Sequence, residues 1–291
     1  MREAMHYAMT GSGEAVCGLC PWGCRIGRGG TGRCGARRND GSALVAATYG
    51  HISSMALDPI GKKPLARFRP GSRILSIGGY GCNMDCPYCQ NHAISRSAPG
   101  PHPVGAEPGE TTPGEVARRS AALAPQGNIG VAYTYNEPLI GYEFVYDCCK
   151  LIKGQGQSNV LVTNGMVCEG PLAELLGYVD AANVDLKCFD AGTYGRLGGD
   201  LPTVTSSIRA CAAACHLEVT ALIVPGMNDS VPEMEALSGF LAGIDPGIPL
   251  HVTRFFPRHR MSGAEATDLG LIYRLAEVAR ASLWHVYEGN C

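Results

Sequence analysis

The sequence predicts an α/β fold, a partial (β/α)6 TIM-type barrel that follows an N-terminal cysteine-rich module. From Arg73 onward, short apolar, β-rich runs alternate with helical periods, a pattern typical of parallel βαβ units. Polar residues directly follow several of these runs, and in a barrel such residues converge on one face. Four of the 14 cysteines lie within residues 17–34, ahead of the first run.

The predicted elements follow one another in a regular order. RILSIG at 73–78 is the first buried strand. The further strands are expected at 129–135, 159–163, 181–187, 217–224, 250–255 and 283–287, and helices at 138–153, 204–215, 232–241 and 266–281. The predicted domains are 1–70, a metal-binding module with its linker, and 71–291, the barrel. The second domain is shorter than the roughly 250 residues of a complete eightfold barrel, which favours six units.

Composition narrows the class of protein. With 291 residues, 45% hydrophobic and 17% charged, the chain is expected to fold around a large core. A net charge of −2 supplies no excess of positive charge for phosphates, so neither nucleic acid nor an anionic membrane is an expected partner. No apolar run has the length of a membrane span, and residues 1–16 lack a signal-peptide core. We therefore expect a cytoplasmic protein, in which clustered cysteines indicate metal or redox chemistry.

Three cysteines follow the first predicted strand directly. Cys82, Cys86 and Cys89 have the spacing C-x3-C-x2-C and come after a glycine-rich turn. The glycines let the backbone approach a compact cluster, and three thiolates on a four-iron cluster leave one iron open for reaction. The alternative is a zinc site whose fourth ligand is His92 or a distant cysteine.

A second group of cysteines has the spacing C-x2-C-x3-C-x9-C and comprises Cys17, Cys20, Cys24 and Cys34. Four thiolates complete the coordination of a zinc ion or of an auxiliary iron–sulfur cluster. The spacing does not decide between them, and the segment slightly favours zinc or a structural use. The adjacent Arg37 and Arg38 are expected on a solvated face.

The three-cysteine loop, with Tyr88 before its last cysteine, resembles the cluster loop of the radical S-adenosylmethionine (SAM) superfamily. Further segments match in order: HISSMALDPIGKKPLARFRPGSRILSIGGYGCNMDCPYCQNHAIS, YTYNEPL, LVTNG, ANVDLK, VTALIVPGMNDS and HVTRFFP. Together they are similar to the AmmeMemoRadiSam-system radical SAM proteins, relatives of the pyruvate formate-lyase activating enzymes. The resemblance covers roughly residues 17–290, and an ordered string of this length is more specific than any single motif.

This resemblance implies roles for individual residues. It implies that the three loop cysteines hold a catalytic 4Fe-4S cluster with SAM on its open iron, and that Tyr88 lies against the adenine. Asn136 and Glu137 stand where related activases bind the SAM amino group through a Gly-Gly-Glu motif. Further candidates for ribose, carboxylate, catalytic or substrate contacts are Asn164, Asp185, Lys187, His251 and Arg254.

Each of these roles has a structural alternative. Glu137 could instead begin a helix, where its charge favours the helix dipole. Asp185 and Lys187 could form an internal ion pair at the barrel mouth. His251, on an apolar strand, could be a core histidine with a hydrogen-bond partner. The remaining cysteines are expected to be small core residues, except Cys188 at the barrel mouth and Cys291, which has no assigned role.

The expected activity is that of a radical SAM oxidoreductase or activase-like enzyme. Such an enzyme cleaves SAM reductively to methionine and a 5′-deoxyadenosyl radical, which abstracts hydrogen from a small-molecule or protein substrate. The electron would come from a reductant such as flavodoxin or ferredoxin. Two alternatives remain: a glycyl-radical-enzyme activase that acts on a protein partner, and a non-catalytic iron–sulfur or zinc scaffold for electron transfer.

Overall fold

The computed structural model describes residues 2–96 and 109–291, and its main element is an eight-stranded sheet. The strand order is β16-β15-β14-β13-β12-β11-β9-β8. All strands from β9 to β16 in this sheet run parallel, whereas β8 (Ser54–Pro59) pairs antiparallel with β9. The parallel strands are β9 (Arg73–Gly78), β11 (Asn128–Tyr133), β12 (Ser158–Thr163), β13 (Ala181–Asp185), β14 (His216–Ile223), β15 (Leu250–Arg254) and β16 (Val286–Gly289).

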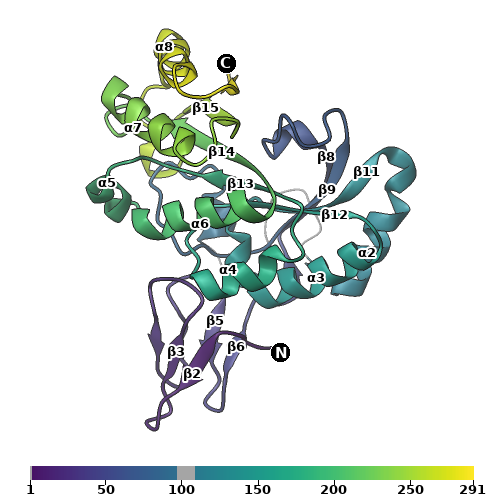
Figure 1. The fold of residues 1–291 in the computed structure, drawn as a ribbon. Coiled ribbons are helices and arrows are strands. Elements are labelled where there is room, and N and C mark those ends of the chain that lie inside the picture. Colours follow the sequence, from purple (N-terminus) through teal and green to yellow (C-terminus); the bar gives the residue numbers. More distant parts are fainter. Residues whose placement is uncertain (1, 97–108) are drawn as a thin grey trace.

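Helices follow six successive parallel strands, so six βα units precede β16. They are α1 (His92–Ser95) and α2 (Pro113–Ala122), α3 (Tyr142–Gly154), α4 (Glu169–Leu176), α5 (Ala191–Arg196) and α6 (Leu201–Ala214), α7 (Val231–Ala242) and α8 (Leu269–Arg280). Figure 1 shows α2, α3, α4 and α6 along one side of the sheet. The predicted partial (β/α)6 barrel is confirmed, and the antiparallel strand β8 is an element that was not predicted from the sequence.

Side-chain caps fix where several helices begin. Asp200 accepts a hydrogen bond from the Thr203 backbone N–H at 2.9 Å, and α6 therefore begins at Leu201 rather than at residue 204. Asp268 accepts from the Leu271 N–H at 2.9 Å and sets the start of α8 in the same way. The helix expected over 138–153 is divided into a short 3-10 turn, η3 (Pro138–Gly141), and α3.

The barrel interior is filled near the amino ends of its strands. The segment after β8 begins with the turn η1 (Ile60–Lys62), and its Ile60 and Leu65 pack against inward-facing residues of four strands. Asn183 on β13 donates a hydrogen bond to the Pro64 carbonyl at 2.8 Å. We call residues 60–68 the floor segment, because they close this end of the barrel and leave the carboxyl ends of the strands for the site.

The N-terminal residues form two small antiparallel sheets. One has the order β1 (Arg2–Glu3), β6 (Leu44–Ala46) and β5 (Arg37–Asn39), and the other β2 (Tyr7–Met9), β3 (Ala15–Cys17) and β4 (Arg25–Ile26). In Figure 1 these strands extend below α3 and α4. A further strand, β7 (His51–Ile52), pairs with β10 (Gly109–Glu110). The domain boundary near residue 70 stays a prediction, and the pairing within the barrel sheet already begins at Ser54.

Arg37 connects this module to the barrel. The expectation that it lies on a solvated face is wrong, since its side chain is 1% exposed and Nη1 lies 2.8 Å from Glu143 Oε1 on α3. Glu143 Oε1 also accepts from the Met5 backbone N–H at 2.6 Å.

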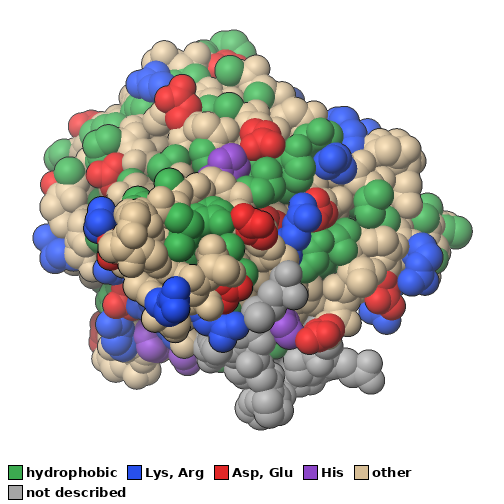
Figure 2. All heavy atoms as spheres, turned by 90° about the horizontal axis from the view of Figure 1, so that it is seen from below, with side chains coloured by type: hydrophobic (Ala, Val, Ile, Leu, Met, Phe, Trp, Pro, Cys, Tyr) green, Lys and Arg blue, Asp and Glu red, His purple; other side chains and the backbone are tan. Residues whose placement is uncertain are grey.

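Seen from below, the molecule shows Lys and Arg interspersed with Asp and Glu among hydrophobic side chains (Figure 2). Within the described residues, no helix has both the length and the apolarity to span a bilayer.

Candidate active site

The three-cysteine loop leaves β9 at the carboxyl edge of the sheet, where it contacts the N-terminal module. Gly81 has φ +87°, and a Cβ there would lie 2.2 Å from the Cys34 carbonyl oxygen. Only glycine fits this close approach without displacing backbone. Asn136 fastens the same turn, because its Oδ1 accepts from the Gly79 N–H at 2.9 Å and its Nδ2 donates to the Gly81 carbonyl at 3.0 Å.

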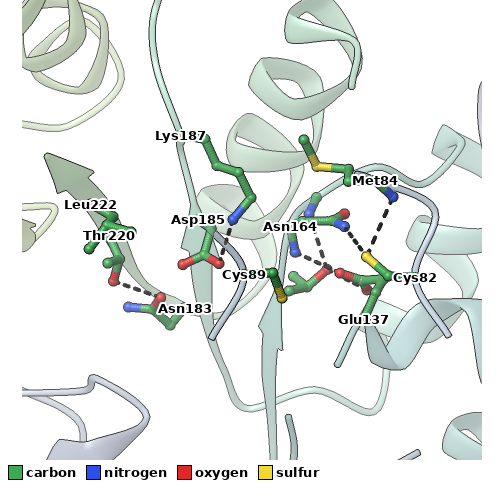
Figure 3. A network of polar contacts seen from close by, with 12 residues as sticks. Cys82, Met84, Cys89, Glu137, Asn164, Asn183, Asp185, Lys187, Thr220 and Leu222 are labelled. Atoms are coloured by element: carbon green, nitrogen blue, oxygen red, sulfur yellow. Dashed lines mark hydrogen bonds and ion pairs between the residues drawn. The ribbon is translucent and has the colours of Figure 1, made fainter. Parts of the chain in front are cut away.

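Cys82 receives two N–H groups on its sulfur. The Met84 backbone N–H lies 3.4 Å from Sγ and the Asn164 amide 3.6 Å from it (Figure 3). Burial, followed by the nearby Glu137 charge, raises the pKa of Cys82 to about 12. A thiol in such surroundings becomes a thiolate when a metal replaces its proton, and N–H donors then stabilise the sulfur ligand.

Cys86 lies close enough to Cys89 and Lys187 for their charges to affect its pKa. Burial raises the pKa of Cys86, the Lys187 charge opposes that shift and the Cys89 charge adds to it. The Cys89 thiol lies 3.9 Å from Ser95 Oγ on α1. All three cysteines of the loop are partly buried free thiols.

Glu137 is a buried carboxylate whose oxygens both accept hydrogen bonds. Oε1 accepts from the Leu139 N–H at 3.0 Å and from Thr163 Oγ1 at 2.8 Å, and Oε2 accepts from the Asn164 N–H at 2.7 Å. Glu137 therefore caps η3, as its structural alternative predicted, and it also fixes Asn164 beside Cys82. Burial raises the pKa of Glu137 to about 7 despite these donors.

Asp185 is the last residue of β13, and it forms an ion pair of 3.0 Å with Lys187, two residues later. In Figure 3 this pair lies across Cys89 from Glu137 and Asn164. Burial lowers the pKa of Lys187, but the charges of Asp185 and Cys86 outweigh it and raise the pKa well above its ordinary value. The predicted ion pair between Asp185 and Lys187 is present. The positive charge of Lys187 also opposes the rise in the pKa of Cys86.

His251 lies away from the loop, above the floor segment. Its Nε2 is 2.6 Å from Glu218 Oε2, and Glu218 also accepts from the backbone N–H groups of Ala66 and Arg67, at 2.8 Å each. His251 also stacks on Tyr287 with ring centroids 5.4 Å apart. This environment corresponds to the core-histidine alternative.

The other candidates are spread around the site. Tyr88 is buried, with its ring edge-on to Phe255 at 6.4 Å. Arg254 donates from Nε to the Thr267 carbonyl at 2.7 Å, and Cys188 is buried with its thiol 3.6 Å from the Asp190 carbonyl. Among the cysteines expected in the core, Cys148, Cys149 and Cys211 are buried, whereas Cys168 and Cys215 are half-buried.

Two further polar groups were missed in the sequence. Asn83 accepts on Oδ1 from the Asn164 amide at 3.0 Å, and its place inside the three-cysteine loop was the available signal. Inside the barrel, Asp58 Oδ2 accepts from both Lys63 Nζ and Tyr135 OH at 2.7 Å. Tyr135 has φ +70°, a conformation that is rare for a tyrosine and concentrates at functional sites.

Comparison with known proteins identifies the family. The sequence profile of the Radical SAM superfamily matches residues 76–237. The chain is also 35% identical over 297 residues to the uncharacterized protein MJ0808 of Methanocaldococcus jannaschii, an alignment that covers 100% of this chain and 85% of that protein. The chain belongs to the radical SAM superfamily. The superfamily implies a 4Fe-4S cluster and SAM as cofactors.

Other radical SAM proteins extend the likeness. The pyruvate formate-lyase-activating enzyme of Clostridium pasteurianum is 25% identical over 219 residues, which are 72% of this chain and 84% of that enzyme. QueE from Escherichia coli superposes with a TM-score of 0.52 at 15% identity, over 83% of this chain and 93% of QueE. SuiB from Streptococcus suis gives 0.54 at 14% identity, over 80% and 52% of the two chains. These two structures share the fold.

The residues of the loop fit an iron–sulfur cluster of this superfamily. Three thiols stand in one short loop at the carboxyl edge of the sheet, and N–H donors already point at one of them. The zinc alternative required His92 or a distant cysteine as a fourth ligand, and the His92 ring instead contacts the Cys89 carbonyl at 3.1 Å and stacks on His259 at 4.5 Å. In the described ranges, no three His, Cys, Asp or Glu side chains are arranged to hold one metal ion.

Proposed function

We propose that this radical SAM protein is an enzyme that cleaves SAM reductively at a 4Fe-4S cluster held by Cys82, Cys86 and Cys89. When bound, the cluster and SAM supply a 5′-deoxyadenosyl radical, with release of methionine, for hydrogen abstraction from a substrate. The observation that carries this proposal is the position of the three thiols, between the Glu137–Asn164 group and the Asp185–Lys187 pair. A scaffold for electron transfer alone would not need these polar groups around an incomplete ligand set.

The residues around the loop take distinct roles in this proposal. Asn136 holds the glycine turn, and Glu137 holds Asn164 against Cys82. Lys187 offers a half-buried positive charge for the anionic groups of SAM. Tyr88 packs against the adenine. Because these contacts are made before SAM arrives, they need little reorganisation at the moment of reaction.

The substrate and the electron donor are a second part of the proposal. The likeness to pyruvate formate-lyase-activating enzyme supports activation of a protein partner at a glycine, while the enclosed polar group of Asp58, Lys63 and Tyr135 supports a small molecule inside the barrel. A low-potential protein such as flavodoxin or ferredoxin would deliver one electron per turnover. The floor segment leaves the carboxyl edge as the route for the substrate.

The test is anaerobic reconstitution with iron and sulfide, reduction with dithionite and addition of SAM. Wild-type protein is expected to form 5′-deoxyadenosine and methionine in equal amounts, and Cys86→Ala is expected to form neither. Cys168→Ala is the matched control, because this half-buried cysteine lies outside the loop and should leave the yield unchanged. An intact, reducible cluster in the three-cysteine loop that never cleaves SAM would refute the proposal.

A further inference from the structure

Four thiols of the N-terminal module line one cavity. Cys17 lies on β3, Cys20 and Cys24 lie on the turn that follows it, and Cys34 precedes β5. Arg37 and Asn83 also line this cavity. Segments separated in the sequence thus bring a complete set of four sulfur ligands to one place.

A buried guanidinium faces this cavity with unused donors. Arg37 is 1% exposed, and its Nη1 is bonded to Glu143 Oε1 at 2.8 Å and to the Met5 carbonyl at 3.3 Å. Among the residues that the structure describes, its Nε and Nη2 have no hydrogen-bond partner. Buried N–H donors that stay unpaired destabilise the fold, so such donors beside four thiols indicate an acceptor that occupies the cavity. Arg33, whose guanidinium lies 4.0 Å above the Trp22 ring, lines the same wall.

The arrangement of the thiols distinguishes a cluster from a single ion. Zinc requires its four sulfurs about 2.3 Å from one point. In the described part of the chain the cysteines line a cavity instead, and no three of them are arranged around one ion. A set of thiols spaced around a hollow is the arrangement that a polyatomic iron–sulfur cluster needs.

The cavity adjoins the three-cysteine loop through Asn83. The Asn83 carbonyl accepts from Trp22 Nε1 at 2.9 Å, and its side-chain oxygen accepts from the Asn164 amide that also donates to Cys82 Sγ. The Cys34 carbonyl packs directly against Gly81, the residue before Cys82. The two neighbours of Cys82 in the chain, Gly81 and Asn83, therefore both contact the module that forms the cavity.

We propose that Cys17, Cys20, Cys24 and Cys34 hold a second, fully ligated four-iron iron–sulfur cluster, whose sulfurs accept N–H groups of Arg37 and which passes electrons to the cluster of the three-cysteine loop. In each transfer the second cluster is oxidised by one electron, the loop cluster is reduced by one, and an external low-potential one-electron donor restores the second cluster. The metal assignment stands by itself, and the electron transfer rests on the proposed function.

The first test measures iron, acid-labile sulfide and zinc per chain after anaerobic reconstitution. Wild-type protein should contain about eight iron ions, and Cys82→Ala/Cys86→Ala/Cys89→Ala about four, with the electron paramagnetic resonance (EPR) signal of a reduced four-iron cluster. Cys20→Ala/Cys24→Ala should lose the same four, while Cys215→Ala, at a half-buried cysteine whose thiol contacts the Cys211 carbonyl at 3.4 Å, keeps all eight. About one zinc per chain, or no metal in the triple variant, would overturn the assignment.

The second test addresses the connection between the clusters. Dithionite-reduced wild-type protein should show a broadened, fast-relaxing EPR signal from two interacting clusters, and each cysteine variant a narrow signal from one. In the triple variant, Arg37→Lys keeps the charge opposite Glu143 but removes two donors, so the reduction potential should become more negative. An unchanged reduction potential in the Arg37→Lys variant would contradict the contact between Arg37 and the second cluster. Two narrow, non-interacting EPR signals in wild-type protein would contradict the electron transfer.

The two proposals fail in different ways. If wild-type protein cleaves SAM but contains zinc in the N-terminal module, only the proposal of a second iron–sulfur cluster is refuted. If the triple variant contains four iron ions but wild-type protein never forms 5′-deoxyadenosine, only the proposed function is refuted. Circular dichroism of each variant separates a lost ligand from a lost fold, because the four module cysteines lie outside the barrel sheet.

Discussion

Lys187 contacts Asp185 at 3.0 Å while its charge also acts on Cys86. Lys187→Met removes that charge and should leave the iron content unchanged. We expect the SAM concentration for half-maximal 5′-deoxyadenosine formation to rise about tenfold or more, since a hydrogen bond to a charged group is worth roughly 1.5–3 kcal/mol. Lys153→Met, which breaks the outer ion pair with Asp180, is the control. Equal half-maximal concentrations in wild type and Lys187→Met would exclude a role in binding SAM.

Glu218 predicts a specific dependence of stability on pH. Burial alone would raise its pKa, but hydrogen bonds from His216, His251 and two backbone N–H groups lower it to about 2. A carboxylate with a lowered pKa in the folded state stabilises the fold above its ordinary pKa near 4.5, and this contribution is lost as the pH falls toward about 2. A shift from 4.5 to about 2 corresponds to a contribution of at most about 3 kcal/mol to the free energy of unfolding.

Urea unfolding of the metal-free chain at several pH values tests this prediction. The free energy of unfolding of wild type should exceed that of Glu218→Gln at pH 5, and the difference should shrink as the pH approaches 2. The exposed Glu277, which pairs with Arg280 at 2.5 Å, supplies the control variant Glu277→Gln, which should follow wild type throughout. A difference that is independent of pH would mean that Glu218 is protonated in the fold.

At the scale of elements, the periodicity of the sequence predicted the parallel strands and the longer helices, because each buries a regular apolar face. It did not predict β8, since Ser54–Pro59 shows no clear alternation and owes its strand form to pairing with β9. The cysteines of the loop could be proposed from their spacing after a strand, and the candidate residues after strands β11 to β13 were proposed from the resemblance to radical SAM proteins. The burial of Arg37 could not, because its partner Glu143 lies 106 positions away.

The glycine turn before the three-cysteine loop gives a prediction about a connecting element. Gly81→Ala places a side chain at φ +87°, 2.2 Å from the Cys34 carbonyl oxygen, and should destabilise the fold by about 1–3 kcal/mol or more. Gly239→Ala is the opposite case, since a Cβ in the middle of α7 meets nothing within 4 Å and should stabilise by about 0.5–1 kcal/mol. Chemical denaturation of both variants checks the pair, and a Gly81→Ala protein as stable as wild type would contradict the close approach.

At the scale of the whole molecule, the buried Arg37–Glu143 pair holds the module on the barrel. Glu143→Leu leaves Arg37 without its partner, and breaking a buried pair in this way costs roughly 3–5 kcal/mol. Glu235→Leu, on the exposed side of α7, should change the free energy of unfolding by less than about 0.5 kcal/mol. Thermal and urea unfolding measure both, and similar values for the two variants would show that the pair contributes little.

The long separations of these contacts have a consequence for biosynthesis. The module leaves the ribosome first, yet Met5 bonds to Glu143, which is 138 positions later, and Ala66 bonds to Glu218, 152 positions later. Contacts between distant parts of a chain form late, because the intervening loop must first be closed. The nascent module, with its thiols exposed, therefore waits until Glu143 has been translated, and the floor segment waits until Glu218 has been translated. Protection of those thiols from oxygen during this interval is a requirement that the fold itself places on the cell.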